Sequence, residues 1–223
     1  MPRTARVAPG GMIYHVINRG VGKQKVFFSD DDYLAFERVI AETLDKRPMR
    51  LLGYCLMPNH WHFVLWPEND GDLGRFMQRL TVTHVTRWQK NYNMVGYGHL
   101  YQGRFKSFPF ETDEHFFQVT RYAERNALRA NLVMQAEEWP WCSLWIDQFA
   151  THEHHAMLSR WPLPRPREWL QYVNEVQTEA ELESLRRSCI RGTPYGSTQW
   201  IEQTVKELGL EATMRKPGRP KKQ

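Results

Sequence analysis

The sequence lacks the features of membrane, secreted and disulfide-bonded proteins. It has no run of about 18 apolar residues that could cross a bilayer, and its first ten residues lack the apolar stretch of a signal peptide. Its three cysteines, Cys55, Cys142 and Cys189, are odd in number and far apart, which argues against a disulfide framework and a CxxC zinc site. We therefore expect a cytoplasmic protein with reduced thiols and no membrane contact.

Two further absences narrow the class of protein. The sequence has no internal repeat and no Gly-rich phosphate loop, so we expect neither a repeat protein nor a dependence on ATP. The 223 residues are 41% hydrophobic and 13% aromatic, which is enough to bury one good core and a smaller appended unit. The net charge of +5 favours a polyanionic partner.

The order of the predicted elements indicates an α+β fold. Apolar alternation predicts strands, and apolar residues at helical spacing predict helices that begin at polar capping residues such as Ser29 or Asp30 and Thr112 or Asp113. The order β-α-β-β-α-β-α matches a ferredoxin-like (RRM-like) antiparallel sheet with helices on one face and one added helix. The strands are expected at 11–19, 49–56, 60–66 and 104–111, and the helices at 30–46, 73–92 and 113–129.

The C-terminal third differs from the rest in composition and in its predicted elements. A predicted linker contains Pro162, Pro164 and Pro166, and helical patterns follow at 167–177, 179–190 and 198–208. The final stretch is basic and contains Gly and Pro. We expect a main α+β domain over 1–135, a helical C-terminal extension over 136–210 and a basic, disordered tail over 211–223.

The most informative stretch is Met-Pro-Asn-His-Trp-His-Phe-Val-Leu-Trp at residues 57–66. Successive side chains of a strand point to opposite faces, so His60 and His62 should project from the same side, roughly 6.5 Å apart along the backbone. This spacing suits two ligands of one metal ion. A pair of hydrogen-bonded strand histidines fits the motif equally well, so the interpretation depends on further parts of a site.

A second motif lies about sixty residues later. In a helix over 113–129, Tyr122 and Asn126 are four residues apart and share one face. The amide oxygen of Asn126 could then approach a metal, while the phenol of Tyr122, which could act as a nucleophile, lies one turn away. The alternative is that Tyr122 packs against the sheet and Asn126 makes a local hydrogen bond.

Three separated segments carry a resemblance to a known family. They are Met-Pro-Asn-His-Trp-His at 57–62, Gly-His-Leu-Tyr-Gln-Gly-Arg-Phe-Lys-Ser at 98–107, and Arg-Tyr-x-x-x-Asn-x-x-Arg-Ala at 121–130. The segment 191–200 and the Gly-Arg-Pro-Lys tail add to the likeness. In this order they resemble the single-tyrosine HUH transposases of the IS200-like superfamily, and within them the REP-associated tyrosine transposases of bacteria.

The resemblance implies a nuclease and strand transferase acting on single-stranded DNA. Tyr122 would attack a backbone phosphate and leave a free 3′-OH and a 5′-phosphotyrosine on the enzyme. His60, His62 and Asn126 would hold Mg²⁺ or Mn²⁺, of which Mn²⁺ better suits imidazole ligands. Many relatives have Gln as the third ligand, and Asn126 is one methylene shorter.

The implied substrate is single-stranded DNA with REP-type elements, which are imperfect palindromes that fold as hairpins. The resemblance therefore implies a nucleoid-associated bacterial protein, monomeric or homodimeric. Looped and single-stranded bases are read by aromatic stacking and cationic grooves. The candidate DNA-binding residues are Arg19, Lys23, Lys25, Tyr101, Arg104, Lys106, Arg121 and Arg129. The Pro-Gly-Arg-Pro segment around Arg219 resembles an AT-hook that fits a narrow minor groove, with a solubilising tail as the alternative.

Two rival functions use the same residues. A non-catalytic nucleic-acid-binding protein would use the sheet and the basic surface, with Tyr122 in a packing role. A metal-dependent phosphodiesterase would use water as the nucleophile. Replacing Tyr122 by Phe separates both from the transposase hypothesis, because neither rival needs the phenolic oxygen.

Overall fold

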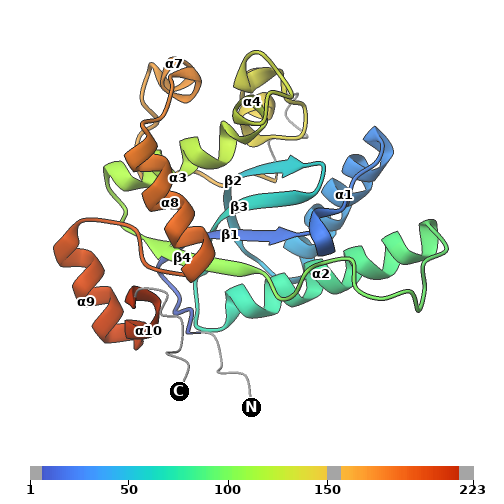
Figure 1. Cartoon of the computed structure of the whole chain (residues 1–223), viewed down its shortest axis with the longest axis horizontal. Coiled ribbons are helices and arrows are strands. Elements are labelled where there is room, and N and C mark those ends of the chain that lie inside the picture. Colours follow the sequence, from blue (N-terminus) through green and yellow to red (C-terminus); the bar gives the residue numbers. More distant parts are fainter. Residues whose placement is uncertain (1–6, 150–156, 216–223) are drawn as a thin grey trace, which may run out of the picture.

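A four-stranded antiparallel sheet organises the chain (Figure 1). We describe it from a computed structural model that places residues 7–149 and 157–215. The strands are β1 (Ile13–Arg19), β2 (Arg50–Met57), β3 (His60–Trp66) and β4 (Lys106–Phe110), in the spatial order β2-β3-β1-β4. All neighbouring strands are antiparallel. The predicted α+β fold with a ferredoxin-like antiparallel sheet is confirmed.

The helices begin largely where the capping residues predict. Ser29 is the N-cap of α1, and Asp113 caps α3 by accepting a hydrogen bond from the backbone N–H of His115. The helices described are α1 (Asp30–Lys46), α2 (Asp72–Asn91), α3 (Glu114–Glu124), α4 (Asn126–Arg129), α5 (Ser143–Phe149), α7 (Trp169–Asn174), α8 (Glu179–Arg191), α9 (Thr198–Leu208) and α10 (Glu211–Met214), with 3₁₀ turns at Val21–Lys23 and Ala136–Glu138. The expectation of disorder from residue 211 is wrong for α10, which forms one helical turn. None of the helices in the described part of the chain is long and apolar enough to span a bilayer.

One face of the sheet packs on α1 and α2. Phe36 of α1 and Phe76 of α2 meet the strand side chains Val16, Trp61 and Phe63 in a single buried cluster. The residues between these strand positions, such as His62 and Val64, point to the opposite face because side chains of a strand alternate. Burying such a face supplies most of the drive for folding, at about 25 cal/mol per Å² of apolar surface.

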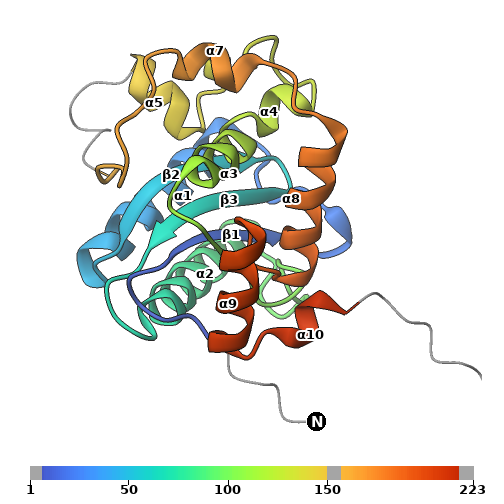
Figure 2. The ribbon, with the colours of Figure 1, turned by 90° about the vertical axis from the view of Figure 1, so that its left-hand side faces the viewer.

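The opposite face of the sheet is covered by α3 and α8, as Figures 1 and 2 show. Phe116 and Val119 of α3 pack with Phe108 of β4 and Leu185 of α8. The expectation of helices on one face describes α1 and α2 but not these two helices. No pattern in the sequence predicts that α8, some fifty residues after α3, packs on the sheet.

A glycine in β2 lets α3 approach the sheet closely. A Cβ atom on Gly53 would lie 3.2 Å from Oγ of Ser143 and 3.7 Å from Oε1 of Glu124. The buried carboxylate of Glu124, at the end of α3, accepts hydrogen bonds from the Ser143 hydroxyl at 2.7 Å and the Trp169 indole at 2.9 Å. The C-terminal end of α3 is therefore held by the segment that follows it in the chain.

Candidate functional site

Two histidines of β3 face the helix layer formed by α3 and α8. His60 and His62 are both buried, and their ring centroids lie 5.0 Å apart. In the sheet register, His62 is opposite Ile17 and His60 is opposite Arg19 on β1. The two rings therefore lie on the same side of the strand, as the alternation predicts.

The end of α3 brings Tyr122 to these histidines, and the first residue of α4 brings Asn126. Nδ2 of Asn126 lies 2.5 Å from Nε2 of His62, and a hydrogen bond also joins the Asn126 amide to His60. The Tyr122 ring lies 5.8 Å from the His62 ring, centroid to centroid. The two motifs that are sixty residues apart in the sequence thus meet in one buried site.

The prediction of one continuous helix over 113–129 is wrong at a single residue. The structure ends α3 at Glu124 and starts α4 at Asn126, with Arg125 between them at φ −79° and ψ 2°. Both flanking side chains make long-range hydrogen bonds, Glu124 to Trp169 and Asn126 to His62. These tertiary contacts compensate for the interruption, and Asn126 still reaches the site.

Burial sets the charge state of the site. Burial lowers the pKa of His60 to about 3, with Arg19 and Arg129 adding to the effect, and it lowers the pKa of His62 well below the usual range. Both imidazoles are therefore neutral, which is the form that binds metal ions. Burial also raises the pKa of Tyr122 to about 12, so its phenol is protonated near neutral pH.

Arg129 lies over the nucleophile candidate. Its guanidinium carbon is 4.2 Å from the centroid of the Tyr122 ring, and its Nη1 donates to Oε1 of Gln177 at 3.2 Å. A guanidinium at this position opposes the rise in the pKa of Tyr122, because it stabilises the phenolate. The buried Gln177 precedes α8, so the C-terminal part of the chain orients this cation.

A basic pocket opens above Tyr122. Its volume is about 560 Å³, and its charged lining side chains are Arg19, Arg104, Lys106 and Arg186. None of the described residues that line it is acidic. Nε of Arg19 is buried and has no hydrogen-bond partner among the described residues, so its N–H can donate to an incoming acceptor group.

This pocket continues into a larger groove of about 1150 Å³. The two share Asn18, Gln102, Gly103 and Arg104, and the groove is bordered by α2 on its far side. The pocket above Tyr122 and the groove therefore border one another at the segment 102–104.

The remaining predicted DNA-binding residues have different surroundings. Lys23 and Lys25 are exposed on the loop after β1, where the Lys23 carbonyl accepts a hydrogen bond from Asn59. Tyr101 is buried, and its hydroxyl accepts from the Trp61 indole at 2.9 Å. Arg121 is buried too, and it donates to the carbonyl of Glu175 at 2.6 Å. Arg219 lies outside the described residues.

Several residues at the site were not singled out from the sequence. His15 contacts His62, Asn59 contacts His60, and Cys189 approaches both His15 and Tyr122. The alternation of side chains along β1 places His15 on the same face as Ile17 and Arg19, and this pattern could have identified His15 as a residue of the site. Cys189, Gln177 and Arg186 had no such signal, because only the tertiary fold brings them here.

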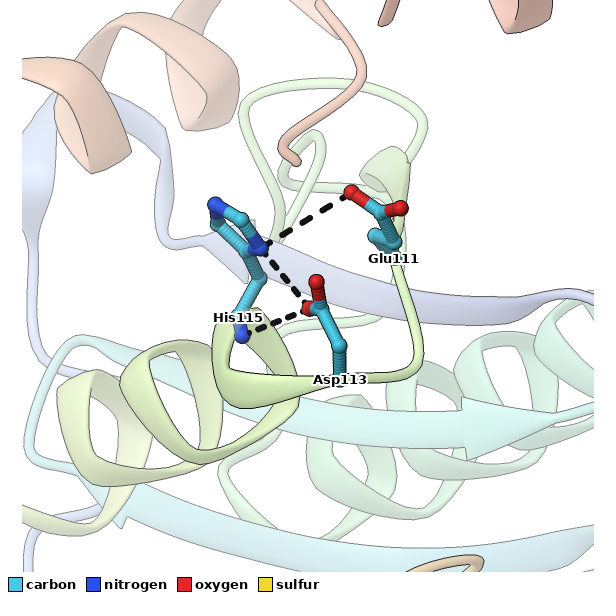
Figure 3. Close-up of side chains that lie close together, drawn as sticks. All are labelled: Glu111, Asp113 and His115. Atoms are coloured by element: carbon cyan, nitrogen blue, oxygen red, sulfur yellow. Dashed lines mark hydrogen bonds and ion pairs between the residues drawn. The ribbon is translucent and has the colours of Figure 1, made fainter. Parts of the chain in front are cut away.

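A second group of metal-ligand types lies at the other end of α3 (Figure 3). The ligand atoms of Glu111, Asp113 and His115 are within 4.8 Å of one another. Asp113 is occupied as the helix cap and accepts from Nδ1 of His115 at 2.7 Å, while Glu111 accepts from the backbone N–H of Ser197 at 2.7 Å. These hydrogen bonds explain why the three side chains lie together: they join β4, the start of α3 and the segment before α9.

Comparisons with known proteins agree with this geometry. A solved REP-associated tyrosine transposase bound to a REP hairpin has the same fold, with a TM-score of 0.53 and 14% sequence identity over 80% of this chain and all of that chain. No curated protein is similar enough in sequence to count as a relative. The sequence profile of the IS200-like transposases matches residues 10–126, slightly more than half of the chain, and this match includes His60, His62, Tyr122 and Asn126. The chain therefore belongs to the IS200-like transposase family, a class of enzymes that cleave and transfer DNA.

Proposed function

We propose that the protein is a single-stranded DNA endonuclease and strand transferase that uses Tyr122 as its nucleophile. The observation that carries the proposal is the convergence of Tyr122, His60, His62 and Asn126 in one buried site below a basic pocket. The packing role considered from the sequence accounts for the burial of Tyr122. It does not account for a cationic pocket whose lining includes this tyrosine.

The reaction exchanges one phosphodiester for another. Oη of Tyr122 bonds to the phosphorus, the bond from phosphorus to the 3′-oxygen breaks, the phenolic proton leaves and the departing 3′-oxygen takes up a proton. The DNA is left with a free 3′-OH and a 5′-phosphotyrosine. Because the two esters are similar in energy, rejoining by the reverse attack needs no nucleotide hydrolysis.

Three side chains fit the requirements of a divalent metal. Nδ1 of His60 is engaged by Asn59 and Nδ1 of His62 by His15, so Nε2 of each neutral ring would be the ligand atom. At His62 the metal would replace the hydrogen bond that Nε2 makes with Nδ2 of Asn126. The Asn126 amide joins both rings, and its oxygen would be the third ligand. When bound, Mn²⁺ or Mg²⁺ would polarise the scissile phosphate and stabilise the charge that develops on it.

The surrounding cations would bind the DNA backbone. Arg19, Arg104 and Lys106 line the pocket above Tyr122, and cationic side chains that bind phosphates supply most of the affinity for nucleic acid. Lys23 and Lys25 extend the basic surface beside the turn that precedes His60. The hydrogen bond to Glu175 gives Arg121 a packing role. Tyr101 also lines the groove that borders the pocket, so we keep it as a candidate for contact with an unpaired base.

We further propose REP-type hairpins with a single-stranded flank as the substrate. The solved transposase with this fold was bound to a REP hairpin, and the groove that continues from the pocket offers room for unpaired nucleotides. The number of chains bound to each hairpin can be measured as the stoichiometry of the purified protein–DNA complex.

The test is a cleavage assay with the full chain. End-labelled single-stranded DNA carrying a hairpin is incubated with Mn²⁺ or Mg²⁺ and resolved on a denaturing gel. We expect a covalent protein–DNA band that disappears in Tyr122→Phe, because Phe keeps the ring but lacks the attacking oxygen. Hydrolysis retained in Tyr122→Phe without an adduct would indicate water as nucleophile. Tight binding by the wild type without cleavage in either metal would indicate a binding protein.

A further inference from the structure

A third imidazole, His15 of β1, lies directly behind the proposed metal ligands. It is completely buried, and its Nε2 lies 2.8 Å from Nδ1 of His62. In the register of the sheet, His15 is opposite Val64, so it reaches His62 along the diagonal of the same face. The Phe108 ring packs on its other side at 4.9 Å between centroids.

The hydrogen bonds determine which nitrogen of His62 carries the proton. The Asn126 amide presents its Nδ2 donor to Nε2 of His62, so Nε2 is the acceptor and the proton of the neutral ring is on Nδ1. This Nδ1–H then donates to Nε2 of His15. The proton of neutral His15 is left on its own Nδ1, which faces the Cys189 sulfur at 3.9 Å.

His60 is oriented in the same way by a different residue. Nδ2 of Asn59 donates to the Lys23 carbonyl at 3.1 Å, which turns the Asn59 oxygen toward His60. Nδ1 of His60 donates to that oxygen at 2.6 Å. Each of the two rings therefore has its Nδ1 proton held by an acceptor, which turns its Nε2 toward Asn126, the third proposed ligand.

We propose that His15 is a positioning residue of the metal site: it accepts the Nδ1 proton of His62 and thereby holds the Nε2 lone pair toward the metal. The inference rests on the proposed function, because it takes His62 as a ligand. Partners of this kind fix the orientation of ligating histidines, and their loss typically weakens metal binding 10- to 100-fold.

Two substitutions separate the hydrogen bond from the packing of the ring. His15→Phe keeps an aromatic ring against Phe108 but removes the acceptor, whereas His15→Gln supplies an amide oxygen as a new acceptor. Mn²⁺ affinity of the full chain is measured by the electron paramagnetic resonance signal of free Mn²⁺. We expect a Kd at least about 10-fold higher for His15→Phe and a smaller change for His15→Gln. Ile13→Val, on the same strand and face, controls for altered packing and should keep the wild-type Kd. A wild-type Kd for His15→Phe would overturn the proposal.

A second measurement uses the wild type alone and therefore does not depend on the folding of a variant. In metal-free protein with ¹⁵N-labelled histidine, the nitrogen chemical shifts report the tautomer of each ring. We expect His62 to carry its proton on Nδ1. Mn²⁺ binding by a protein whose His62 is protonated on Nε2 would overturn the role of His15 and leave the proposed function intact. A wild type that binds no Mn²⁺ would overturn the metal site, and the role of His15 with it.

Discussion

His84 illustrates how a single buried imidazole couples folding to pH. It lies on α2, away from the proposed metal ligands, and its Nδ1 is 2.6 Å from the Tyr101 hydroxyl. That hydroxyl accepts from the Trp61 indole and therefore donates its own proton to His84. The network requires the neutral ring, and burial lowers the pKa of His84 to about 3.

We predict that His84 makes the protein less stable in mild acid. In the unfolded chain the ring has a pKa of about 6.5, so below that pH the unfolded state takes up a proton that the folded state does not bind. Between pH 7 and pH 5 this one group should remove about 2 kcal/mol of the free energy of unfolding. His84→Asn retains an acceptor near the position of Nδ1 and does not titrate. Urea unfolding at the two pH values should show a loss smaller by about that amount in the variant, and equal losses in both proteins would contradict the assignment.

Single elements differ in how far the sequence predicts them. The bounds of α1 and β3 agree with the prediction because each is specified locally, α1 by its capping residues and β3 by the Pro58–Asn59 turn before it. The interruption at Arg125 has no such signal, since neither Gly nor Pro is present there. The position of α8 over the sheet depends on contacts of Leu182, Leu185 and Cys189 with apolar residues that are distant in the sequence. His60, His62, Tyr122 and Asn126 could be identified from motifs, whereas their neighbours on α8 could not.

The position of α8 leads to a prediction about DNA affinity. Arg186 lines the pocket above Tyr122, whereas Arg187, the next residue of the helix, is exposed and does not line it. The only ion pair that the structure gives Arg186 among the described residues is with the exposed Glu179, which holds it weakly. We therefore expect Arg186 to bind a backbone phosphate of the proposed substrate.

Arg186→Ala should weaken binding of single-stranded DNA similarly for all sequences and reduce the slope of log K against log salt concentration by about 0.7, the value for one phosphate contact. Arg187→Ala, which removes the same charge from the same helix, is the matched control. Fluorescence anisotropy across a salt series measures both quantities. Identical slopes for the two variants would mean that α8 contributes only through the net charge of the molecule.

At the scale of the whole molecule, the site joins distant parts of the chain. β1 supplies Arg19, β3 supplies His60 and His62, the end of α3 supplies Tyr122, and α8 supplies Arg186. The proposed catalytic domain over 1–135 thus contains the reacting groups, while the extension over 136–210 lines one side of their pocket. Ligand binding should consequently stabilise the fold as a unit, because a ligand that binds only the folded state shifts the unfolding equilibrium by mass action.

Mn²⁺ should therefore raise the melting temperature, and the two candidate metal positions can be distinguished by this effect. At 100 times its Kd a ligand adds about 2.7 kcal/mol, or roughly 5–10 °C for a chain of this size. We expect this shift in the wild type, its reversal by EDTA, and its absence in His60→Ala/His62→Ala. His115→Gln, which alters the group at the start of α3, should keep the shift because those side chains serve as a cap and a junction. Scanning calorimetry measures all three proteins. A shift that persists without His60 and His62 but is lost in His115→Gln would place the metal at the far end of α3, where Tyr122 could not use it.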